Sequence, residues 1–390
     1  MSRIAQIAAI LSVLRGGVFL SACLIGAVLP AQTAAGKLAF PFGPCRRASN
    51  TPILAPNPAS TFDDAVTGKP VAWEALHTFN PAAVVRDNRV LLLYRAEDNT
   101  GAMQIGMHTS RLGLAESDDG VHFRAQATPV FFPAKDAQQA REWPGGVEDP
   151  RLVESPDGTY VLTYTQWNRK TYTVGIATSR DLVHWTKYGP AFDEAAGGKY
   201  RKLQYKSAGI LTRLSGGRLV AAKMDGKFWM YWGEIQVRLA TSPDLIHWTP
   251  IEDAQGNPKV LLTSRPGLFD SGFPEVGPPP LLTSQGIIVF YNGKNADGKT
   301  PGDHAAPTLS AGAYSGGQAL FSATSPTKLL ARPAQPYLQP VLPFEKTGQY
   351  KAGTIFTEGL VYFHKQWMLY YGAADSFVGV AKCPASQVAP

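Results

Sequence analysis

Residues 177–185 read Ala-Thr-Ser-Arg-Asp-Leu-Val-His-Trp, and this stretch decides the fold because it recurs. The same pattern, Ala-Thr-Ser-x-Asp-Leu-x-x-Trp, returns at 240–248, and a looser version runs from Ala115 to Phe123. A run rich in Val, Leu, Tyr or Trp precedes each copy, as is typical of a short strand. A period of about 60 residues suits one four-stranded unit of a repeating all-β fold.

Strand-rich runs divide the chain into five such units. The runs lie at 89–94, 159–164, 218–232, 286–291 and 366–371, and clusters of Gly, Pro, Asp and Asn separate them. Because a closed ring of strand units removes exposed sheet edges, five units predict a five-bladed β-propeller. The site is expected at one mouth of its central channel, and the Asp-Leu-x-x-Trp elements are interpreted as turns with an aromatic wedge.

The N-terminal residues 1–35 resemble an export signal. Arg3 and Arg15 precede an apolar run from Gly17 to Pro30, which leads into small residues at 31–35. An alternative is a lipoprotein signal that ends before Cys23, and only this alternative would place the chain at a membrane. Residues 36–390 are predicted to form one catalytic propeller domain.

Charge and cysteine content limit the remaining choices. Removing Arg3 and Arg15 from the formal charge of +7 leaves +5. The sequence contains no run of five or six basic residues, so nucleic-acid binding is poorly supported. Cys45 and Cys383 lie near the two ends of the exported chain. In an oxidising compartment they are expected to form a disulfide, which would bring the termini together. The alternative is that both are unpaired buried thiols.

Two acidic clusters are framed by Gly and Pro, namely Gly145–Arg151 and Phe273–Pro280. Gly and Pro restrict the backbone path, so carboxylates between them point in defined directions. Two rigid carboxylates from distant parts of a chain are what sugar hydrolysis requires. The alternative is that each cluster is a turn whose acid caps the local backbone.

Polar residues also follow or interrupt strands throughout the chain, beside aromatic residues. Such neighbours suit a sugar, because its apolar face packs on rings and its hydroxyls bind charged groups. The segments are Phe79-Asn80-Pro81, Tyr94–Asp98, Glu148–Arg151, Tyr205-Lys206-Ser207, Trp232-Gly233-Glu234, Phe273-Pro274-Glu275, Tyr291-Asn292-Gly293 and Ala373-Ala374-Asp375.

Several of these segments, in order, resemble glycoside hydrolase family 130. They are Phe79-Asn80-Pro81, Tyr94-Arg95-Ala96-Glu97-Asp98, Gly146–Arg151, Gly277–Pro280 and Tyr370–Asp375. The resemblance implies a five-bladed propeller that cleaves β-mannosides with inversion. Most characterised members are phosphorylases that use inorganic phosphate, and a minority are hydrolases.

The resemblance also implies roles for individual residues. Asp149 would be the general acid, and Asn80, Arg95 and Asp375 would line the mannose pocket. Arg151 is expected to fix the loop of the acid by pairing with nearby carboxylates.

The choice between water and phosphate depends on charge. Family phosphorylases use Arg forks and a His for phosphate, whereas this chain has Lys206, Lys223 and Asn292 at the corresponding places. Glu234 and Glu275 would repel phosphate and resemble the glutamate pair that activates water in family hydrolases. Lys206 is also counted as a substrate-binding residue. Both glutamates could instead simply pair with the two lysines.

The leading hypothesis is therefore an exported inverting β-mannosidase acting on β-1,2-linked manno-oligosaccharides. A phosphorylase that binds phosphate through Lys206 and Lys223 is the first alternative, and a non-catalytic glycan-binding propeller is the second. Five-bladed glycosidases acting on arabinosides or fructosides are a further rival class. The seven His residues show no metal-ligand spacing, and neither a metal nor a cofactor is predicted.

Overall fold

The computed structural model describes residues 40–299 and 304–383. The predicted export signal and Cys23 lie outside the described residues. Strands dominate, and the helical segments are short: α1 (Gln139–Glu142), η1 (Ala195–Gly198) and η2 (Pro343–Glu345). The all-β class is confirmed. Within the described ranges, no helix has the length and apolar character needed to cross a membrane.

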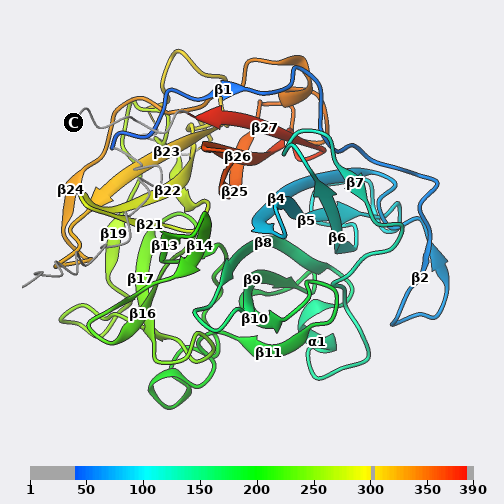
Figure 1. Cartoon of the computed structure of the whole chain (residues 1–390), viewed down its shortest axis with the longest axis horizontal. Coiled ribbons are helices and arrows are strands. Elements are labelled where there is room, and N and C mark those ends of the chain that lie inside the picture. Colours follow the sequence, from blue (N-terminus) through cyan, green and yellow to red (C-terminus); the bar gives the residue numbers. More distant parts are fainter. Residues whose placement is uncertain (1–39, 300–303, 384–390) are drawn as a thin grey trace, which may run out of the picture. The chain divides into compact units, whose positions relative to one another are not determined.

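Most strands belong to antiparallel groups that follow the chain. The first two groups are β4 (His77–Arg86), β5 (Arg89–Glu97), β6 (Ser110–Ser117) and β7 (Arg124–Ala125), then β8 (Gly146–Glu154), β9 (Tyr160–Trp167), β10 (Tyr172–Ser179) and β11 (Thr186–Pro190). Figure 1 shows the second group running outward from β8 to β11.

The later groups repeat this order with more interruptions. The third has β12 (Ala208–Ile210), β15 (Lys223–Met224), β16 (Lys227–Trp232), β17 (Val237–Ser242), β18 (Thr249–Pro250) and β19 (Val260–Leu262). The fourth has β20 (Phe273–Val276), β21 (Leu281–Thr283), β22 (Gly286–Lys294), β23 (Tyr314–Phe321) and β24 (Leu329–Ala331). The last has β25 (Ile355–Phe363), β26 (Gln366–Ala373), β27 (Phe377–Cys383) and β1 (Arg46–Arg47).

Parallel bridges connect neighbouring groups. β6 pairs with β8, and the hairpin of β13 (Thr212–Ser215) and β14 (Arg218–Ala221) joins β8 to β21. The small hairpin of β2 (Phe62–Asp63) and β3 (Pro70–Val71) stands apart. Because the hydrogen-bonded sheets of the described residues do not close into a ring, the five-bladed propeller stays a prediction.

The recurring sequence pattern forms a turn, as predicted. In the copy at 177–185, the Ser179 hydroxyl accepts from the Leu182 amide, and Asp181 Oδ1 accepts from the amides of Val183 and His184. The copies at 115–123 and 240–248 repeat these bonds. The local polar side chains thus satisfy the turn's own amides, which is a structural function.

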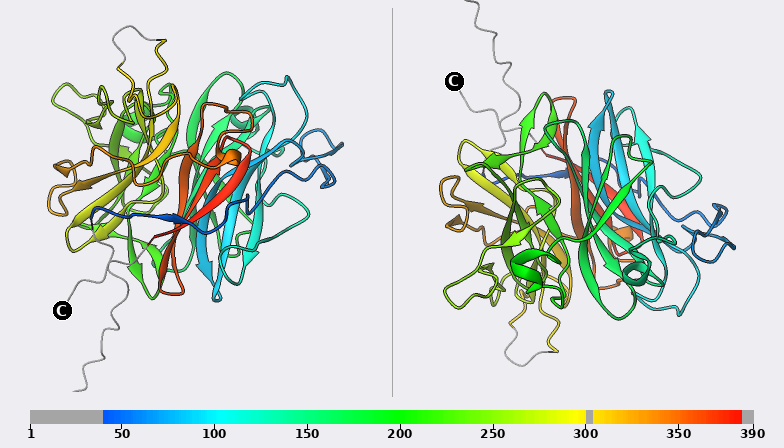
Figure 2. Two further views of the ribbon diagram at one scale, coloured as in Figure 1. Left: turned by 90° about the horizontal axis from the view of Figure 1, so that it is seen from above. Right: turned by 90° about the horizontal axis from the view of Figure 1, so that it is seen from below.

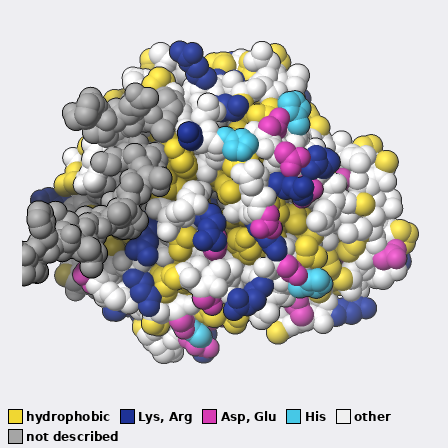
Figure 3. Space-filling view, in the orientation of Figure 1, with side chains coloured by type: hydrophobic (Ala, Val, Ile, Leu, Met, Phe, Trp, Pro, Cys, Tyr) yellow, Lys and Arg dark blue, Asp and Glu magenta, His cyan; other side chains and the backbone are white. Residues whose placement is uncertain are grey.

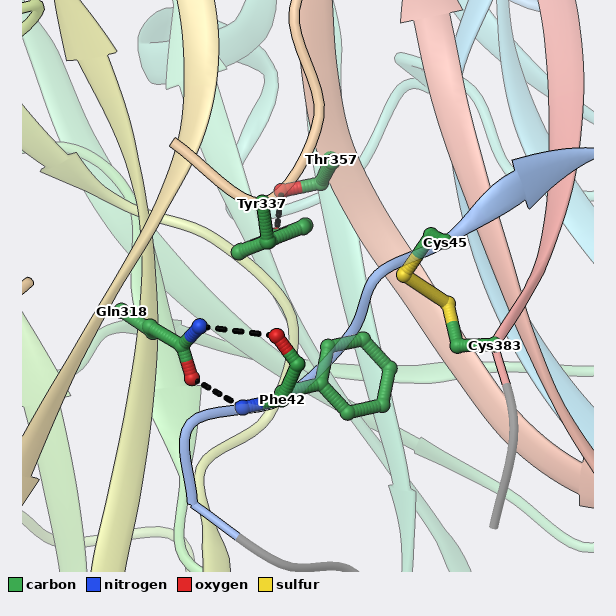
Figure 4. The surroundings of a disulfide bond; sticks show 6 residues. All are labelled: Phe42, Cys45, Gln318, Tyr337, Thr357 and Cys383. Atoms are coloured by element: carbon green, nitrogen blue, oxygen red, sulfur yellow. Dashed lines mark hydrogen bonds between the residues drawn. A yellow bond between two sulfur atoms is a disulfide. The ribbon is translucent and has the colours of Figure 1, made fainter. Parts of the chain in front are cut away.

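The two ends of the described chain meet. β1 pairs with β27, and Figure 2 shows the blue strand beside the red one. Cys45 and Cys383 form a disulfide, which confirms the expected bridge (Figure 4). Next to it, both backbone polar groups of Phe42 bond to the Gln318 side chain. The N-terminal segment is therefore fixed to strands far along the chain.

Replacing Cys45 with Ser is expected to lower the free energy of unfolding by about 2–4 kcal/mol, because the bridge constrains a very long loop of the unfolded chain. Denaturant unfolding followed by tryptophan fluorescence measures this change. Wild type with its disulfide reduced should unfold at the same denaturant concentration as the variant. Equal stability of oxidised wild type and Cys45→Ser would contradict a stabilising bridge.

Candidate active site

A cavity of about 310 Å³ brings together every residue predicted to act in catalysis or glycone binding. β4, β5, β8 and β20 contribute some of them, and the others lie just before β12, just after β16 and just after β26. The residues are Asn80, Arg95, Asp149, Lys206, Glu234, Glu275 and Asp375. Aromatic side chains complete the wall: Phe79, Trp167, Tyr172, Tyr314, Tyr350 and Phe356.

Bulges in two inner strands aim the first pair of site residues. Asn80 in β4 and Asp149 in β8 have φ of 47°, and the strand register shifts at each of them. Asn and Asp tolerate this left-handed conformation better than most residues, and a bulge re-aims the side chain. Pro81 and Pro150 follow directly, so the Asn-Pro and Asp-Pro pairs mark these bulges.

The Asn80 bulge also requires a glycine opposite it. A Cβ on Gly372 in β26 would lie 1.9 Å from Asn80 Oδ1, which no side chain could accommodate. The glycine therefore permits the close approach of β26 to the bulge. Asn80 Nδ2 in turn donates to Asp149 Oδ1 at 2.8 Å, which connects the two bulges.

Arg95 is the cation at the centre of this cluster. Its side chain is 8% exposed and forms ion pairs with Glu97 at 2.6 Å, Glu148 at 2.8 Å and Asp149 at 3.0 Å. Its Nε donates to the Ser110 hydroxyl, and its guanidinium lies over the Phe79 ring. Each nitrogen therefore has a partner within the protein.

The surrounding cations hold Asp149 in its ionised form. Burial would raise its pKa, but Arg95, Lys206 and Arg151 outweigh burial and lower the pKa to about 2. Both protein donors, from Asn80 and Arg95, reach Oδ1. Among the described residues, Oδ2 has no hydrogen-bond partner, so this oxygen is available to a ligand.

The neighbouring carboxylates behave differently. Burial raises the pKa of Glu148 to about 7, against the attraction of Arg95. Burial likewise raises the pKa of Asp375 to about 7. The cluster around Arg95 therefore holds carboxyl groups that carry protons near neutral pH, beside one that does not.

The opposite part of the cavity contains two glutamates and a lysine. Lys206 Nζ lies 3.4 Å from Glu234 and 3.4 Å from Glu275. Burial opposes the charge of Lys206, but Glu275, Glu234 and Asp149 outweigh it and hold the lysine pKa well above its ordinary value. The lysine is therefore a neutralised cation that pairs with both glutamates.

Glu234 and Glu275 are not equivalent. Glu275 is completely buried, Ser207 donates to its Oε1 at 2.5 Å, and its Oε2 has no partner among the described residues. Burial raises the pKa of Glu275 to about 7, against the attraction of Lys206. The Glu234 side chain is 22% exposed. The buried glutamate is better suited to accept a proton near neutral pH.

Arg151 connects β8, the strand that carries Asp149, to β20, and so fixes the backbone around Asp149 as expected from its position. Its side chain donates to the carbonyls of Asp149, Val276 and Gly277 and pairs with Glu358 at 3.0 Å. Glu358 was not predicted from the sequence. It sits at a bulge in β25, and the short Thr-Glu-Gly segment around it has no distinctive signal.

Lys223, predicted as a phosphate ligand, and Asn292, which stands where family phosphorylases have a His, are not among the residues that line the cavity. Lys223 is exposed on β15, and its Nζ lies over the Phe228 ring at the opposite end of β16 from Glu234. Lys223 therefore does not line the cavity, and the structure gives no support to its prediction as a phosphate ligand. Asn292 is buried and bonds to the backbone and hydroxyl of Thr357, which joins β22 to β25.

The cavity defines a class of site. Five carboxylates and only two cations line it, together with aromatic rings. Such a wall suits a neutral ligand with many hydroxyl groups and an apolar face, and the carboxylates could transfer protons. This is the chemistry of a carbohydrate-cleaving enzyme.

Comparisons with known proteins identify the family. The sequence profile of glycoside hydrolase family 130, described as beta-1,4-mannooligosaccharide phosphorylase, matches residues 44–389. The chain therefore belongs to glycoside hydrolase family 130, as the sequence motifs predicted.

Individual relatives have different described activities. The 1,2-beta-oligomannan phosphorylase of Thermoanaerobacter sp. (strain X514) is 28% identical over 86% of this chain and 96% of its own length. A solved glycosyl hydrolase from Bacteroides ovatus is 47% identical, with a TM-score of 0.84, and the match covers 89% of this chain and 96% of that one.

Another solved structure comes from work described as finding glycoside hydrolases, within this family of mannoside phosphorylases, that target beta-1,2 mannosidic linkages in Candida mannan. That protein is 47% identical to this chain, and the TM-score is 0.85. The match covers 89% of this chain and 96% of that one.

Substituting Arg95 with Gln is expected to lower the free energy of unfolding by about 3–5 kcal/mol, because three carboxylates would lose their buried partner. Urea unfolding measures the change. Arg89→Gln is the control, since Arg89 is exposed and should change stability by only about 0.5 kcal/mol or less. Equal losses in the two variants would contradict the central role of Arg95.

Proposed function

We propose that this protein is an exported, inverting β-mannoside hydrolase that acts on β-1,2-linked manno-oligosaccharides. Asp149 serves as the general acid, and Glu275 activates water with the help of Glu234. Asn80, Arg95 and Asp375 hold the mannose unit. We also propose that the antiparallel strand groups are the blades of a five-bladed propeller, with the cavity at one mouth of its channel.

The pairing of Lys206 with both glutamates is the observation that favours water over phosphate as the nucleophile. A phosphate nucleophile needs unpaired basic donors, but Arg95 and Lys206 are already neutralised by carboxylates. With Lys223 outside the cavity, no further Lys or Arg lines the part of the wall that the structure describes. A phosphate dianion would face an excess of negative charge, whereas water would not.

The reaction needs two proton transfers. The Glu275 carboxylate takes a proton from water while the water oxygen attacks the anomeric carbon of the mannose unit. The bond to the leaving oxygen breaks, and a proton supplied through Asp149 Oδ2 neutralises that oxygen. Attack from the face opposite the leaving group inverts the anomeric centre.

The acid must acquire a proton before each turnover. Asp149 is ionised, but adjacent Glu148 holds a proton up to about pH 7, and both residues share Arg95. A sugar that occupies the cavity excludes water and places a hydroxyl against Asp149. In this proposal the Glu148–Asp149 pair together holds the one proton that is delivered.

The relatives include proteins described as hydrolases and proteins described as phosphorylases, so they support both main readings. The 47% identical structures are described as hydrolases, whereas the phosphorylase relative is 28% identical. The family profile itself is described as a phosphorylase, which favours phosphorolysis as the alternative function. The disulfide between Cys45 and Cys383 supports export, because such bonds persist in oxidising compartments.

Incubating the purified protein with β-1,2-mannobiose, with and without inorganic phosphate, separates the two reactions. We expect mannose at the same rate in both, with no mannose 1-phosphate, because none of the described residues offers phosphate an unpaired cation in the cavity. Asp149→Asn should lower kcat/KM by about 10²–10⁴-fold. Strict dependence on phosphate would refute the hydrolase, and sugar binding without turnover would support a non-catalytic propeller.

The pH profile tests the base. Since burial raises the pKa of Glu275 to about 7, its carboxylate is lost as pH falls through that value, so kcat/KM should rise with pH up to about 7. Glu275→Gln should lose about 10²–10⁴-fold in activity and also lose this acidic limb. If the limb persists in the variant, another carboxyl group, such as Glu148 or Asp375, controls it.

A further inference from the structure

Two histidines and a glutamate meet beside the cavity. The ligand atoms of His77, Glu97 and His108 all lie within 4.8 Å of one another. His77 begins β4, Glu97 ends β5, and His108 precedes β6, so three separate segments converge. Glu97 is completely buried and His108 is 2% exposed. The two histidines are far apart in sequence, and for that reason no ligand spacing is visible there.

Hydrogen bonds orient both imidazole rings. His108 Nδ1 lies 3.1 Å from the Thr100 carbonyl oxygen, to which it can only donate, so His108 Nε2 carries a lone pair. His77 Nδ1 bonds to the Ser376 hydroxyl at 2.8 Å. Neither Nε2 has a hydrogen-bond partner among the described residues. Metal-binding histidines are commonly oriented in this way, with one nitrogen bonded to the protein and the other left for the ion.

The local charge favours a cation. Arg95 meets Glu97, Glu148 and Asp149 within 3.0 Å, so three carboxylates surround one guanidinium. The carboxylates outnumber the one guanidinium, so the group carries net negative charge, which a bound cation would offset. Glu97 itself is anchored, since its Oε1 accepts from Arg95 and its Oε2 from Gln349 at 3.1 Å. A bound metal ion would replace the longer of these two hydrogen bonds, which Gln349 donates to Oε2.

We propose that His77, His108 and Glu97 bind one divalent transition-metal ion of the zinc class. Two imidazole nitrogens and one carboxylate oxygen form a donor set that Zn²⁺ accepts, with water or another ligand in the fourth position. Ligand atoms around such an ion lie closer together than 4.8 Å, so binding draws the three side chains inward by a small distance.

The bound ion would stabilise one wall of the sugar cavity. Ile105 and Gly106, just before His108, line that wall, and the Gly106 carbonyl accepts from Trp167 Nε1 at 2.9 Å. Joining His108 to β4 and β5 fixes the segment that carries these residues. The ion thus acts as a structural clamp beside the catalytic residues, and it takes no part in the proton transfers.

Zinc binding by the purified protein tests this proposal. After treatment with a chelator and dialysis, titration calorimetry with zinc sulfate should show one site per chain. Zinc should also raise the thermal unfolding midpoint, because the ion binds only the folded site. Cobalt chloride should give the visible absorption of a Co²⁺ ion with nitrogen ligands. If neither ion binds and the midpoint does not move, the proposal is wrong.

Variants locate the ion. His108→Ala and His77→Gln should each weaken zinc binding at least about tenfold, since even supporting residues of metal sites have effects of that size. His122→Ala is the control, because His122 is exposed and pairs with Asp119 far from the cluster. Unchanged affinity in both cluster variants, or loss only in the control, would show adventitious surface binding and overturn the proposal.

Folding of the variants is checked by circular dichroism before titration. Should either cluster variant fail to fold, anomalous X-ray scattering at the zinc edge from wild-type crystals decides the matter. A peak between the two Nε2 atoms and Glu97 supports the site. A zinc peak only at the surface, or no peak, refutes it.

Discussion

The buried guanidinium of Arg95 is the interaction on which the rest of the site depends. It pairs with Glu97, Glu148 and Asp149, and no other cation lies within ion-pair distance of these carboxylates in the described parts of the chain. Burying this many carboxylates without a partner would be very costly. Because one cation serves several anions, their protonation is unequal, with Asp149 ionised and Glu148 titrating near neutrality. Acid catalysis can use this difference in protonation, because a carboxyl group that keeps its proton near neutral pH lies beside one that does not.

Irregular backbone conformations orient the side chains of this charge cluster. Asn80 and Asp149 stand at bulges with left-handed φ, and Glu358 stands at a third bulge in β25. The strands on either side keep the sheets packed, so the unusual conformation is held by regular structure. Arg151 then ties the acidic bulge to β20, the strand that carries Glu275. The proposed acid and the proposed base are therefore held by one connected unit.

Much of this arrangement could be read from local sequence. The repeated Ser-x-Asp turns, the strand runs and the Asn-Pro and Asp-Pro pairs depend on neighbouring residues, and their turns and bulges are present. The disulfide was also expected. The sequence could not show that Lys223 lies outside the cavity, because a position along a hairpin says nothing about which end of the strand faces the cavity. Glu358 and the cluster of His77 and His108 were missed because no local pattern marks them.

The sequence by itself determined the all-β class, the family and the candidate residues for the chemistry, because short-range patterns and motifs specify turns, strands and side-chain type. Only the tertiary structure decided which of those side chains form ion pairs and which are buried. Lys206 is neutralised because Glu234 and Glu275 reach it from separate segments, and Glu275 is the stronger base candidate because it alone of the pair is buried. Distance and burial set these properties, and both arise from contacts between residues far apart in the chain.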